Sequence, residues 1–172
     1  NLEQADENDL YAAMDWLYER KDSIEKKLAK EHLDEGALIL YDGSSSYYTG
    51  SHCTLAKFGK DSANGFPQIN YGLLCNKEGC PVGVEVFDGN INDAKALGRQ
   101  LDKVRNRFGL KRIIMVGDRG SITTARINEE IKPAGGIDWI TALRAPAIKG
   151  LAEQGLIQLS LFDERDMAEI TS

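Results

Sequence analysis

The sequence has few of the residues from which metal fingers and disulfide frameworks are built. Its 172 residues include three cysteines, Cys53, Cys75 and Cys80, and two histidines. None of them shows zinc-finger spacing, and an odd number of cysteines without such spacing is typical of a reducing compartment. Neither structural zinc nor a disulfide scaffold is therefore expected.

Long hydrophobic runs are also missing. No stretch approaches the roughly 18 apolar residues that a membrane-spanning helix requires, and no basic and apolar leader opens the chain. We therefore expect a protein of the bacterial cytoplasm that makes no membrane contact. A hydrophobic content of 42% and an aromatic content of 8% are sufficient for one compact domain.

Excess positive charge is absent from the chain as a whole but not from its middle. The net charge of −6 opposes binding to nucleic acid, which requires basic residues that replace counterions. The acids are concentrated at the two ends, whereas residues 36–152 hold 15 bases against 11 acids. A nucleic-acid partner is therefore compatible with the middle of the chain.

The first part of the chain predicts one long helix over residues 8–33. Apolar residues from Leu10 to Leu28 follow a near-heptad spacing, and Asn8 is the expected cap. A helix with so narrow an apolar seam must dock either on the domain that follows or on a second copy of itself.

From Gly36 onward the apolar pattern takes the period of strands and then alternates with that of helices. Strands are predicted at residues 37–42, 67–75, 81–87, 112–118 and 137–143, and helices at residues 92–109 and 121–132. We expect Val82, Val84 and Val86 on one face of the third strand, and Asn92 and Ser121 as helix caps. The resulting order predicts a mixed α/β sheet flanked by helices.

Two aspartates close two of these strands, Asp42 the first and Asp118 the fourth. A hairpin-linked meander followed by a right-handed helical crossover brings the fourth strand back parallel to the first, on its free side. This predicts the strand order 3-2-1-4-5 with strand 2 antiparallel. Both acids then lie at the carboxyl ends of neighbouring parallel strands, where open α/β sheets bind ligands.

Two carboxylates so close together either share a proton or hold a cation. Oxygen ligands without imidazole or thiolate select Mg²⁺ or Mn²⁺, and such a pair suits phosphoryl transfer by two metal ions. The alternative is that each aspartate only forms a turn or caps a helix. We interpret Asp88, in the turn sequence "DGN", as such a turn residue.

Three stretches resemble the DDE transposases of bacterial insertion sequences: "LYDGSSSYYTG" at the first strand, "FDGNINDAKAL" after the third and "VGDRGSIT" after the fourth. The resemblance extends from about residue 38 to residue 144. It implies a ribonuclease H-like catalytic domain in which Asp42 and Asp118 are the first two acids of a catalytic triad. Asn90 and Asp93 match the stretch that precedes the first helix of that domain.

The third acid of the family, a glutamate, does not occur here in its usual context. In the family it lies in a motif of the form Y-x2-R-x3-E-x6-K, but no tyrosine follows Tyr71. Glu153, Glu164 and Glu169 have none of that context. The resemblance therefore implies a transposase that cuts and joins DNA ends with Mg²⁺ or Mn²⁺, of which this chain is a fragment that is inactive alone.

The resemblance also implies an organisation and a set of partners. Residues 1–35 are expected to be a docking or linker helix, residues 36–145 an incomplete catalytic core, and residues 146–172 the start of an insertion or a truncated tail. Double-stranded DNA, at transposon ends and at the target, is the expected partner, and the complete protein is expected to form homo-oligomers. No small-molecule cofactor is expected, and the protein would associate with the nucleoid when it acts.

Candidate DNA contacts lie close to the two acids. Arg119 can grip a phosphate in fork geometry, or it can form a structural salt bridge. Ser44 and Ser45 can offer hydroxyls to a DNA backbone, or they can form a solvated strand edge. The basic residues of the segment 99–112 are better explained as the outer face of a helix that packs behind the sheet.

Two other functions compete with this interpretation. A haloacid dehalogenase-like Mg²⁺ phosphatase also places an aspartate after its first strand, but it requires a second aspartate two residues later, where this chain has Ser44. A non-catalytic assembly domain that docks through its first helix is the other alternative. It predicts that substitution of Asp42 or Asp118 leaves function intact.

Overall fold

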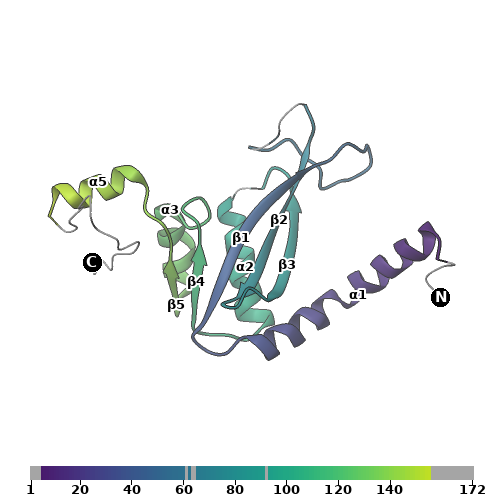
Figure 1. The fold of residues 1–172 in the computed structure, drawn as a ribbon, viewed down its shortest axis with the longest axis horizontal. Helices are drawn as coiled ribbons and strands as arrows, with labels where there is room; N and C mark the ends of the chain where they lie inside the picture. The colour runs from purple at the N-terminus through teal and green to yellow at the C-terminus, as the bar shows by residue number, and fades with distance from the viewer. Residues whose placement is uncertain (1–4, 61, 63–64, 92, 156–172) are drawn as a thin grey trace.

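The computed structural model describes residues 5–60, 62, 65–91 and 93–155. Its centre is a five-stranded sheet, shown in Figure 1, with the strand order β3-β2-β1-β4-β5. The strands are β1 (Ala37–Tyr47), β2 (Gln68–Asn76), β3 (Pro81–Asp88), β4 (Ile113–Gly117) and β5 (Ile137–Ile140). Strand β2 runs antiparallel to β1 and β3, whereas β4 runs parallel to β1 and β5. The predicted strand order and directions are confirmed.

The helices of the described residues fall into four groups along the chain. The long helix α1 (Glu7–His32) precedes the sheet, and α2 (Asp93–Asp102) continues into the π-helical turn η2 (Lys103–Arg107) between β3 and β4. Between β4 and β5 the chain forms α3 (Thr124–Arg126), the π-helical turn η3 (Ile127–Ile131) and α4 (Lys132–Ala134). Helix α5 (Ala145–Glu153) follows the last strand.

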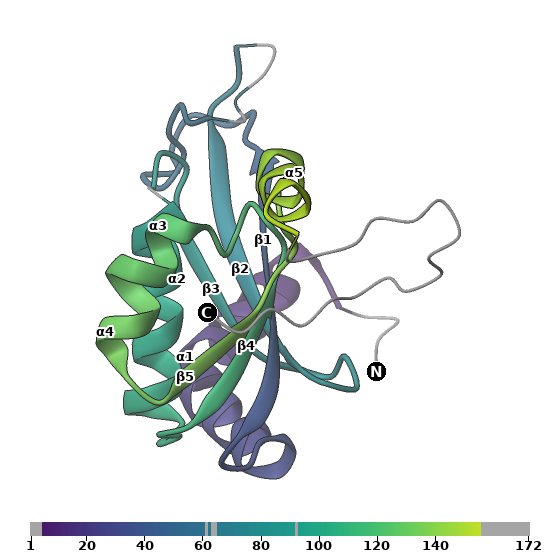
Figure 2. The same ribbon diagram turned by 90° about the vertical axis from the view of Figure 1, so that its left-hand side faces the viewer.

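One face of the sheet carries the core. Figure 2 shows α2, α3 and α4 on the same side of the strands. Ile39, Leu74 and Met115 point to this side from three neighbouring strands and are fully buried. Leu97 and Leu101 of α2 are buried against them, as the helical spacing predicts.

The first strand is longer than its sequence pattern predicts. The polar run after Asp42 looks like a loop, but β1 continues through it to Tyr47, because Asp42 pairs with Leu73 and Ser44 with Tyr71 of β2. The fifth strand is shorter than predicted and ends at Ile140. Strand length is thus set by the neighbouring strand, which supplies the hydrogen bonds that a local pattern does not contain.

Three helix boundaries differ from the sequence-based expectation. Asp6, not Asn8, caps α1 through a reciprocal pair of 3.0 Å hydrogen bonds with Asp9. Thr123, not Ser121, caps α3. The helical segment that follows runs past Pro133 to Ala134. Pro133 lies in the first turn of α4, a position at which the fixed backbone angle and missing N–H of proline are tolerated. The predicted cap Asn92 lies outside the described residues.

The predicted common face of the three β3 valines holds only for Val84 and Val86. Val82 is fully buried in the core, beside the irregular pairing of β2 and β3 at Leu74 and Cys75. Val84 and Val86 are exposed, whereas Gly83 and Phe87, which point to the helix-covered side, are buried. The helices of the described chain cover the opposite face of the sheet at this edge (Figure 2). Alternation therefore predicted the common face of Val84 and Val86, but neither the exposure of that face nor the different position of Val82.

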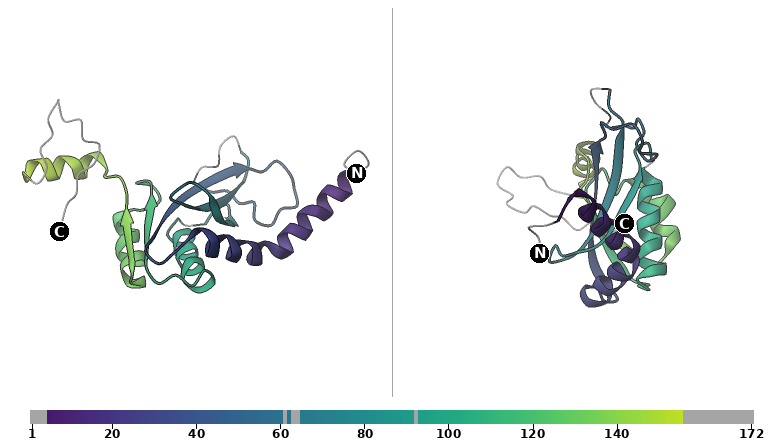
Figure 3. Two further views of the ribbon diagram at one scale, coloured as in Figure 1. Left: turned by 60° about the horizontal axis from the view of Figure 1, so that its bottom comes forward. Right: turned by 90° about the vertical axis from the view of Figure 1, so that its right-hand side faces the viewer.

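Helix α1 docks on the free edge of β3. Glu25 accepts a hydrogen bond of 2.8 Å from the backbone N–H of Val84, and Lys103 Nζ donates one of 2.8 Å to the carbonyl oxygen of Val84. These side chains satisfy backbone groups that an edge strand otherwise presents to other chains. Figure 3 shows the N-terminal half of α1 extending away from the sheet, and Leu10 and Leu17 are exposed there. Of the two predicted docking modes, the structure shows the first for the C-terminal half of α1.

No helix within the described residues is both long and apolar enough to cross a membrane. The three cysteines are free thiols.

The loop after β1 returns to the sheet by a close backbone crossing at Gly89. The N–H of Gly89 donates to the Leu55 carbonyl oxygen at 2.9 Å. A Cβ atom at position 89 would lie 1.8 Å from the Gln68 carbonyl oxygen and 2.6 Å from that of Lys57. Both obstacles are backbone atoms, so they cannot rotate away.

We therefore expect Gly89→Ala to lower the free energy of unfolding by about 3 kcal/mol, the upper end of the cost of overpacking. Urea denaturation measures this change. Gly150→Ala is the matched control, since no atom lies within 4 Å of its added Cβ and the residue is helical, so alanine should be neutral or stabilising. Equal stability of the two variants would contradict the prediction.

Candidate active site at the fork between two strands

The two predicted acids lie where β1 and β4 separate. The last paired residues of the two parallel strands are Tyr41 and Gly117. Asp42 and Asp118 follow directly, on strands that lie about 4.8 Å apart. Strand β1 continues beyond Asp42, whereas β4 ends before Asp118. The structure thus places the two predicted metal ligands at neighbouring backbone positions, where β1 and β4 separate.

Asp42 is part of a continuous strand and does not form a turn. It is paired with Leu73 of β2, and its side chain is exposed. By the alternation along β1, its side chain points to the face opposite the buried Ile39 and Tyr41. For Asp42 the turn-former alternative is therefore wrong, and an exposed carboxylate in the interior of a strand calls for another explanation.

A polar cluster accompanies Asp42 on this face. Ser46 Oγ donates to Tyr71 Oη at 3.3 Å. Hydrogen bonds from Ser44 and Ser46 lower the pKa of the Tyr71 hydroxyl, against an opposing effect of the nearby Asp42 charge. The hydroxyls of Ser44 and Ser46 thus favour the ionised form of the Tyr71 hydroxyl, which lies near Asp42.

Asp118 begins a tight loop that its own side chain organises. The backbone N–H of Ser121 donates to Asp118 Oδ1 at 2.6 Å, and that of Ile122 donates to the Asp118 carbonyl oxygen at 2.9 Å. Hydrogen bonds from Ser121, from its side chain first, lower the pKa of Asp118. Asp118 does form a turn, as the alternative interpretation states, but it is also an ionised carboxylate at neutral pH. A carboxylate offers about four lone-pair positions, so a bond to Ser121 leaves capacity for a cation.

Two residues that the sequence analysis did not single out hold this loop from either side. Thr141 Oγ1, after β5, donates to the carbonyl oxygens of Asp118 and Ile122 at 3.1 and 3.2 Å. Arg126 of α3 donates to the Ser121 carbonyl oxygen and contributes to the low pKa of Asp118. Arg126 is only 8% exposed, which is unusual for arginine. No local sequence signal identifies either residue, because both contacts depend on strand and helix placement.

A polar groove of about 380 Å³ lies beside the Asp118 loop. Its described lining includes Tyr41, Ser44, Ser45, Lys60, Asp118 and Arg126. Tyr41 points to the side of the sheet that α2 covers, so the groove opens largely on the opposite side of the fork from the Asp42 carboxylate. Of the predicted DNA contacts, Ser44 and Ser45 border this groove, whereas Arg119 is exposed and is not among its described lining residues.

The remaining candidate acids lie elsewhere. Glu153 forms an ion pair with Lys149 at 3.7 Å on α5, and Glu164 and Glu169 are outside the described residues. Asn90 is exposed in the turn after β3, and Asp88 ends that strand with its carbonyl oxygen accepting from the N–H of Ile91 at 3.0 Å. Within the described chain, no group of three or more His, Cys, Asp or Glu residues is close enough to hold a metal ion.

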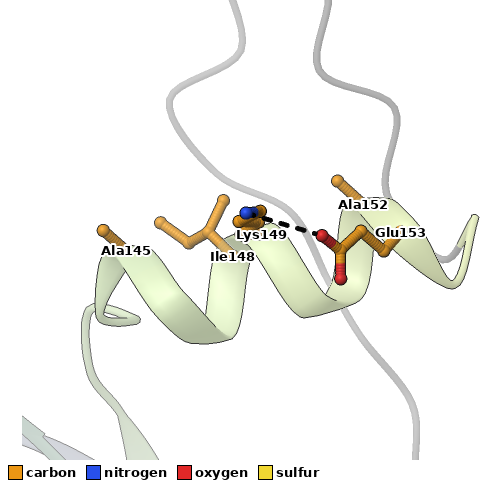
Figure 4. A pocket seen from close by; sticks show the side chains of 5 residues that line it. All are labelled: Ala145, Ile148, Lys149, Ala152 and Glu153. Carbon is orange, nitrogen blue, oxygen red and sulfur yellow. Dashed lines mark ion pairs between the residues drawn. The ribbon is translucent and has the colours of Figure 1, made fainter.

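A second concavity, of about 480 Å³, lies beside α5 (Figure 4). Its described lining comprises Ala145, Ile148, Lys149, Ala152 and Glu153, all from that one helix. Helix α5 projects away from the fork in Figure 1. This concavity therefore belongs to a different region from the two acids.

A protein-family model described as "Transposase DDE domain" matches residues 35–167. No curated protein matches the chain. Among solved structures, the piggyBac transposase synaptic complex with hairpin DNA is similar at 10% identity and a TM-score of 0.44, over 65% of this chain and 24% of that chain. The Mos1 transposase paired-end complex with left transposon end is similar at 14% identity and a TM-score of 0.40, over 77% of this chain and 45% of that chain. The chain thus spans less than half the length of either, and likenesses this distant do not bear on the site.

Proposed function

Because the chain belongs to the transposase DDE domain family, we propose that it is the catalytic-core fragment of a DNA transposase. The complete protein would cleave DNA strands at transposon ends and join them to target DNA. The observation that supports this chemistry most directly is the pair of aspartates at the fork, one in mid-strand and one at a strand end. The phosphatase alternative is not favoured, since the chain belongs to a transposase family and has Ser44 in place of the second aspartate.

We propose Asp42 and Asp118 as the ligands of the divalent metal ions. Their carboxylate oxygens fit Mg²⁺ or Mn²⁺, and the described chain offers no imidazole or thiolate in a cluster with them. When bound, such ions activate the attacking hydroxyl and stabilise the leaving oxygen in an in-line displacement at phosphorus. The described residues fit the metal in donor type, and a further ligand must come from elsewhere.

The protein's own contribution is to hold these carboxylates ionised and in place. Pairing of β1 with β2 fixes the backbone of Asp42, because residues on both sides of it belong to the ladder. The bonds from Ser121 and Thr141 fix the Asp118 loop, and those from Ser121 favour the charged carboxylate. Such preorganisation lowers the cost of assembling the charged site around a DNA phosphate.

The third ligand and the partners follow from the family. We propose that a glutamate absent from this chain completes the site, so that this chain is inactive alone. Residues 36–145 would form the catalytic core, residues 1–35 a docking helix and residues 146–172 the start of an insertion. Double-stranded DNA would be the substrate in the bacterial cytoplasm, and the exposed N-terminal half of α1 would serve assembly with further copies.

The experiment that tests the function is strand cleavage by the complete transposase on DNA that carries its transposon ends. We expect cleavage and strand transfer in Mg²⁺, loss of both in EDTA, and recovery when Mn²⁺ is added, because the hard oxygen site accepts either ion. DNA binding in EDTA serves as the control for intact protein. Cleavage that persists in EDTA would contradict the proposed mechanism.

A further inference from the structure

The groove beside the Asp118 loop carries groups that the metal site does not use. We propose that it binds one nucleotide of the DNA strand being cut, with Lys60 and Arg126 holding the phosphate; the identity of that strand rests on the proposed function. Lys60 comes from the loop after β1 and Arg126 from α3, so the chain brings together two cations that are distant in sequence.

The charge of the groove selects an anion. Among the described side chains that line it, the charged ones are Lys60, Arg126 and Asp118. Two cations and one acid give a positive balance in a chain whose net charge is −6. A divalent cation at Asp118 would make this balance more positive. Phosphate esters are bound in proteins by this combination of lysine, arginine and hydroxyl donors.

The size and lining favour a nucleotide over a bare ion. About 380 Å³ is at the lower end of the range for small-molecule sites and exceeds the space that a phosphate needs. Tyr71, which is half-buried, provides aromatic surface, and Asn70 and Ser45 provide polar groups that can pair with a base or sugar. The sequence contains neither the P-loop nor the dinucleotide fingerprint, so a strand nucleotide is a better occupant than a free nucleotide cofactor.

Both walls of the groove are anchored. The loop with Lys60 is held at Gly59, whose N–H donates to Ser62 Oγ at 2.8 Å; Ser62 Oγ in turn donates to Gln68 Oε1 at 3.1 Å. Gln68 is buried and donates to the Gly89 carbonyl oxygen at 3.0 Å. The position of Lys60 is therefore tied to the end of β3.

The second wall of the groove contains Arg126, whose position is fixed by hydrogen bonds at the start of α3 and to the loop that precedes it. Thr123 caps α3 by accepting a hydrogen bond from the Arg126 N–H at 3.4 Å, and the guanidinium donates to the Ser121 carbonyl oxygen. Arg126 therefore links the groove to the Asp118 carboxylate. A phosphate bound there would lie beside Asp118, on the side of the fork opposite to the Asp42 carboxylate.

Binding of thymidine 5′-monophosphate to the 172-residue chain tests this site. Binding is monitored by NMR chemical-shift titration in EDTA at low ionic strength. We expect saturable shifts at Ser45, Asn70 and Ser121. Lys60→Ala should weaken binding about tenfold, the effect of losing one charge-assisted hydrogen bond at an exposed site, and Lys60→Arg should restore it.

Lys57→Ala is the matched control, because it removes the same charge from the same loop but Lys57 is not among the described lining residues. Equal affinity of the wild type and Lys60→Ala for thymidine 5′-monophosphate would show that the groove is not the binding site. An affinity for inorganic phosphate equal to that for thymidine 5′-monophosphate would show that the groove does not bind a nucleotide as such. The test is independent of cleavage, so an inactive complete protein would contradict the proposed function and leave this site standing.

Discussion

Replacing Asp42 or Asp118 with alanine in the complete transposase is expected to lower strand cleavage at least about a thousandfold, with unchanged affinity for transposon-end DNA. Each substitution removes one of the two described carboxylates at the fork, and metal-ion stabilisation of phosphoryl transfer contributes several kcal/mol. DNA binding should survive, because phosphate contacts come from basic and hydroxyl groups and not from the acids. Cleavage is measured on labelled transposon-end DNA, and binding by a gel-shift assay in EDTA.

Asp88→Ala is the matched control for these two substitutions. Asp88 is also an exposed aspartate at a strand end, but β3 is separated from the fork by β2 and β1. Its substitution should leave cleavage close to the wild-type rate. Normal cleavage by the Asp42→Ala protein would remove Asp42 from the active site and favour the non-catalytic assembly function.

Lys103→Ala is expected to lower the free energy of unfolding by about 3 kcal/mol, the lower end of the cost of breaking a buried ion pair, because it removes a buried ammonium that pairs with two carboxylates. Arg107 and Lys21 remain near these carboxylates, at 3.2 Å from Glu25 and 3.7 Å from Glu85. Lys103 is 3% exposed and lies 2.6 Å from Glu85 Oε2 and 3.2 Å from Glu25 Oε2. It also donates to the Val84 carbonyl oxygen, so its loss breaks a bond at the sheet edge. A loss of this size is a large part of the 5–15 kcal/mol that typically stabilises a domain. Guanidinium denaturation at neutral pH measures it.

The pH dependence provides a second measure of the same cluster. Burial acts to raise the pKa of Glu85, but the hydrogen bond and charge of Lys103 outweigh it, so the pKa is lowered. The resulting stabilisation is present above the unfolded glutamate pKa and is lost as the pH falls through the folded value. Without Lys103, burial dominates, and the penalty of the substitution should shrink in acid, where the carboxylate becomes neutral.

Two variants separate the charge effect from a general loss of helix stability. Lys95→Ala removes an exposed lysine from α2 and should change the free energy of unfolding by no more than about 0.5 kcal/mol. Glu25→Gln combined with Lys103→Met should recover part of the loss, since it removes the buried carboxylate together with the lysine and leaves only the more exposed Glu85 without Lys103. A penalty of Lys103→Ala below about 1 kcal/mol would show that the buried pair contributes little.

Local patterns in the sequence were sufficient to predict the order and type of the main elements and the position of the two acids along the chain. Periods of two and of about 3.6 are local properties, and the core positions Leu97 and Leu101 follow from them. The handedness of the crossover is a general property of β-α-β units. It therefore predicts from the sequence that β4 lies beside β1 and Asp118 beside Asp42.

Features that depend on partners distant in the chain could not be predicted from the sequence and are seen only in the folded protein. The strand continues past Asp42 because β2 lies beside it, and α1 docks because Glu25 meets the edge of β3 and Lys103 of η2. The groove combines Lys60 with Arg126, which no sequence spacing connects. Pairing, burial and ion pairs join residues far apart in the chain, so their energies are fixed by the packed arrangement and not by the local pattern.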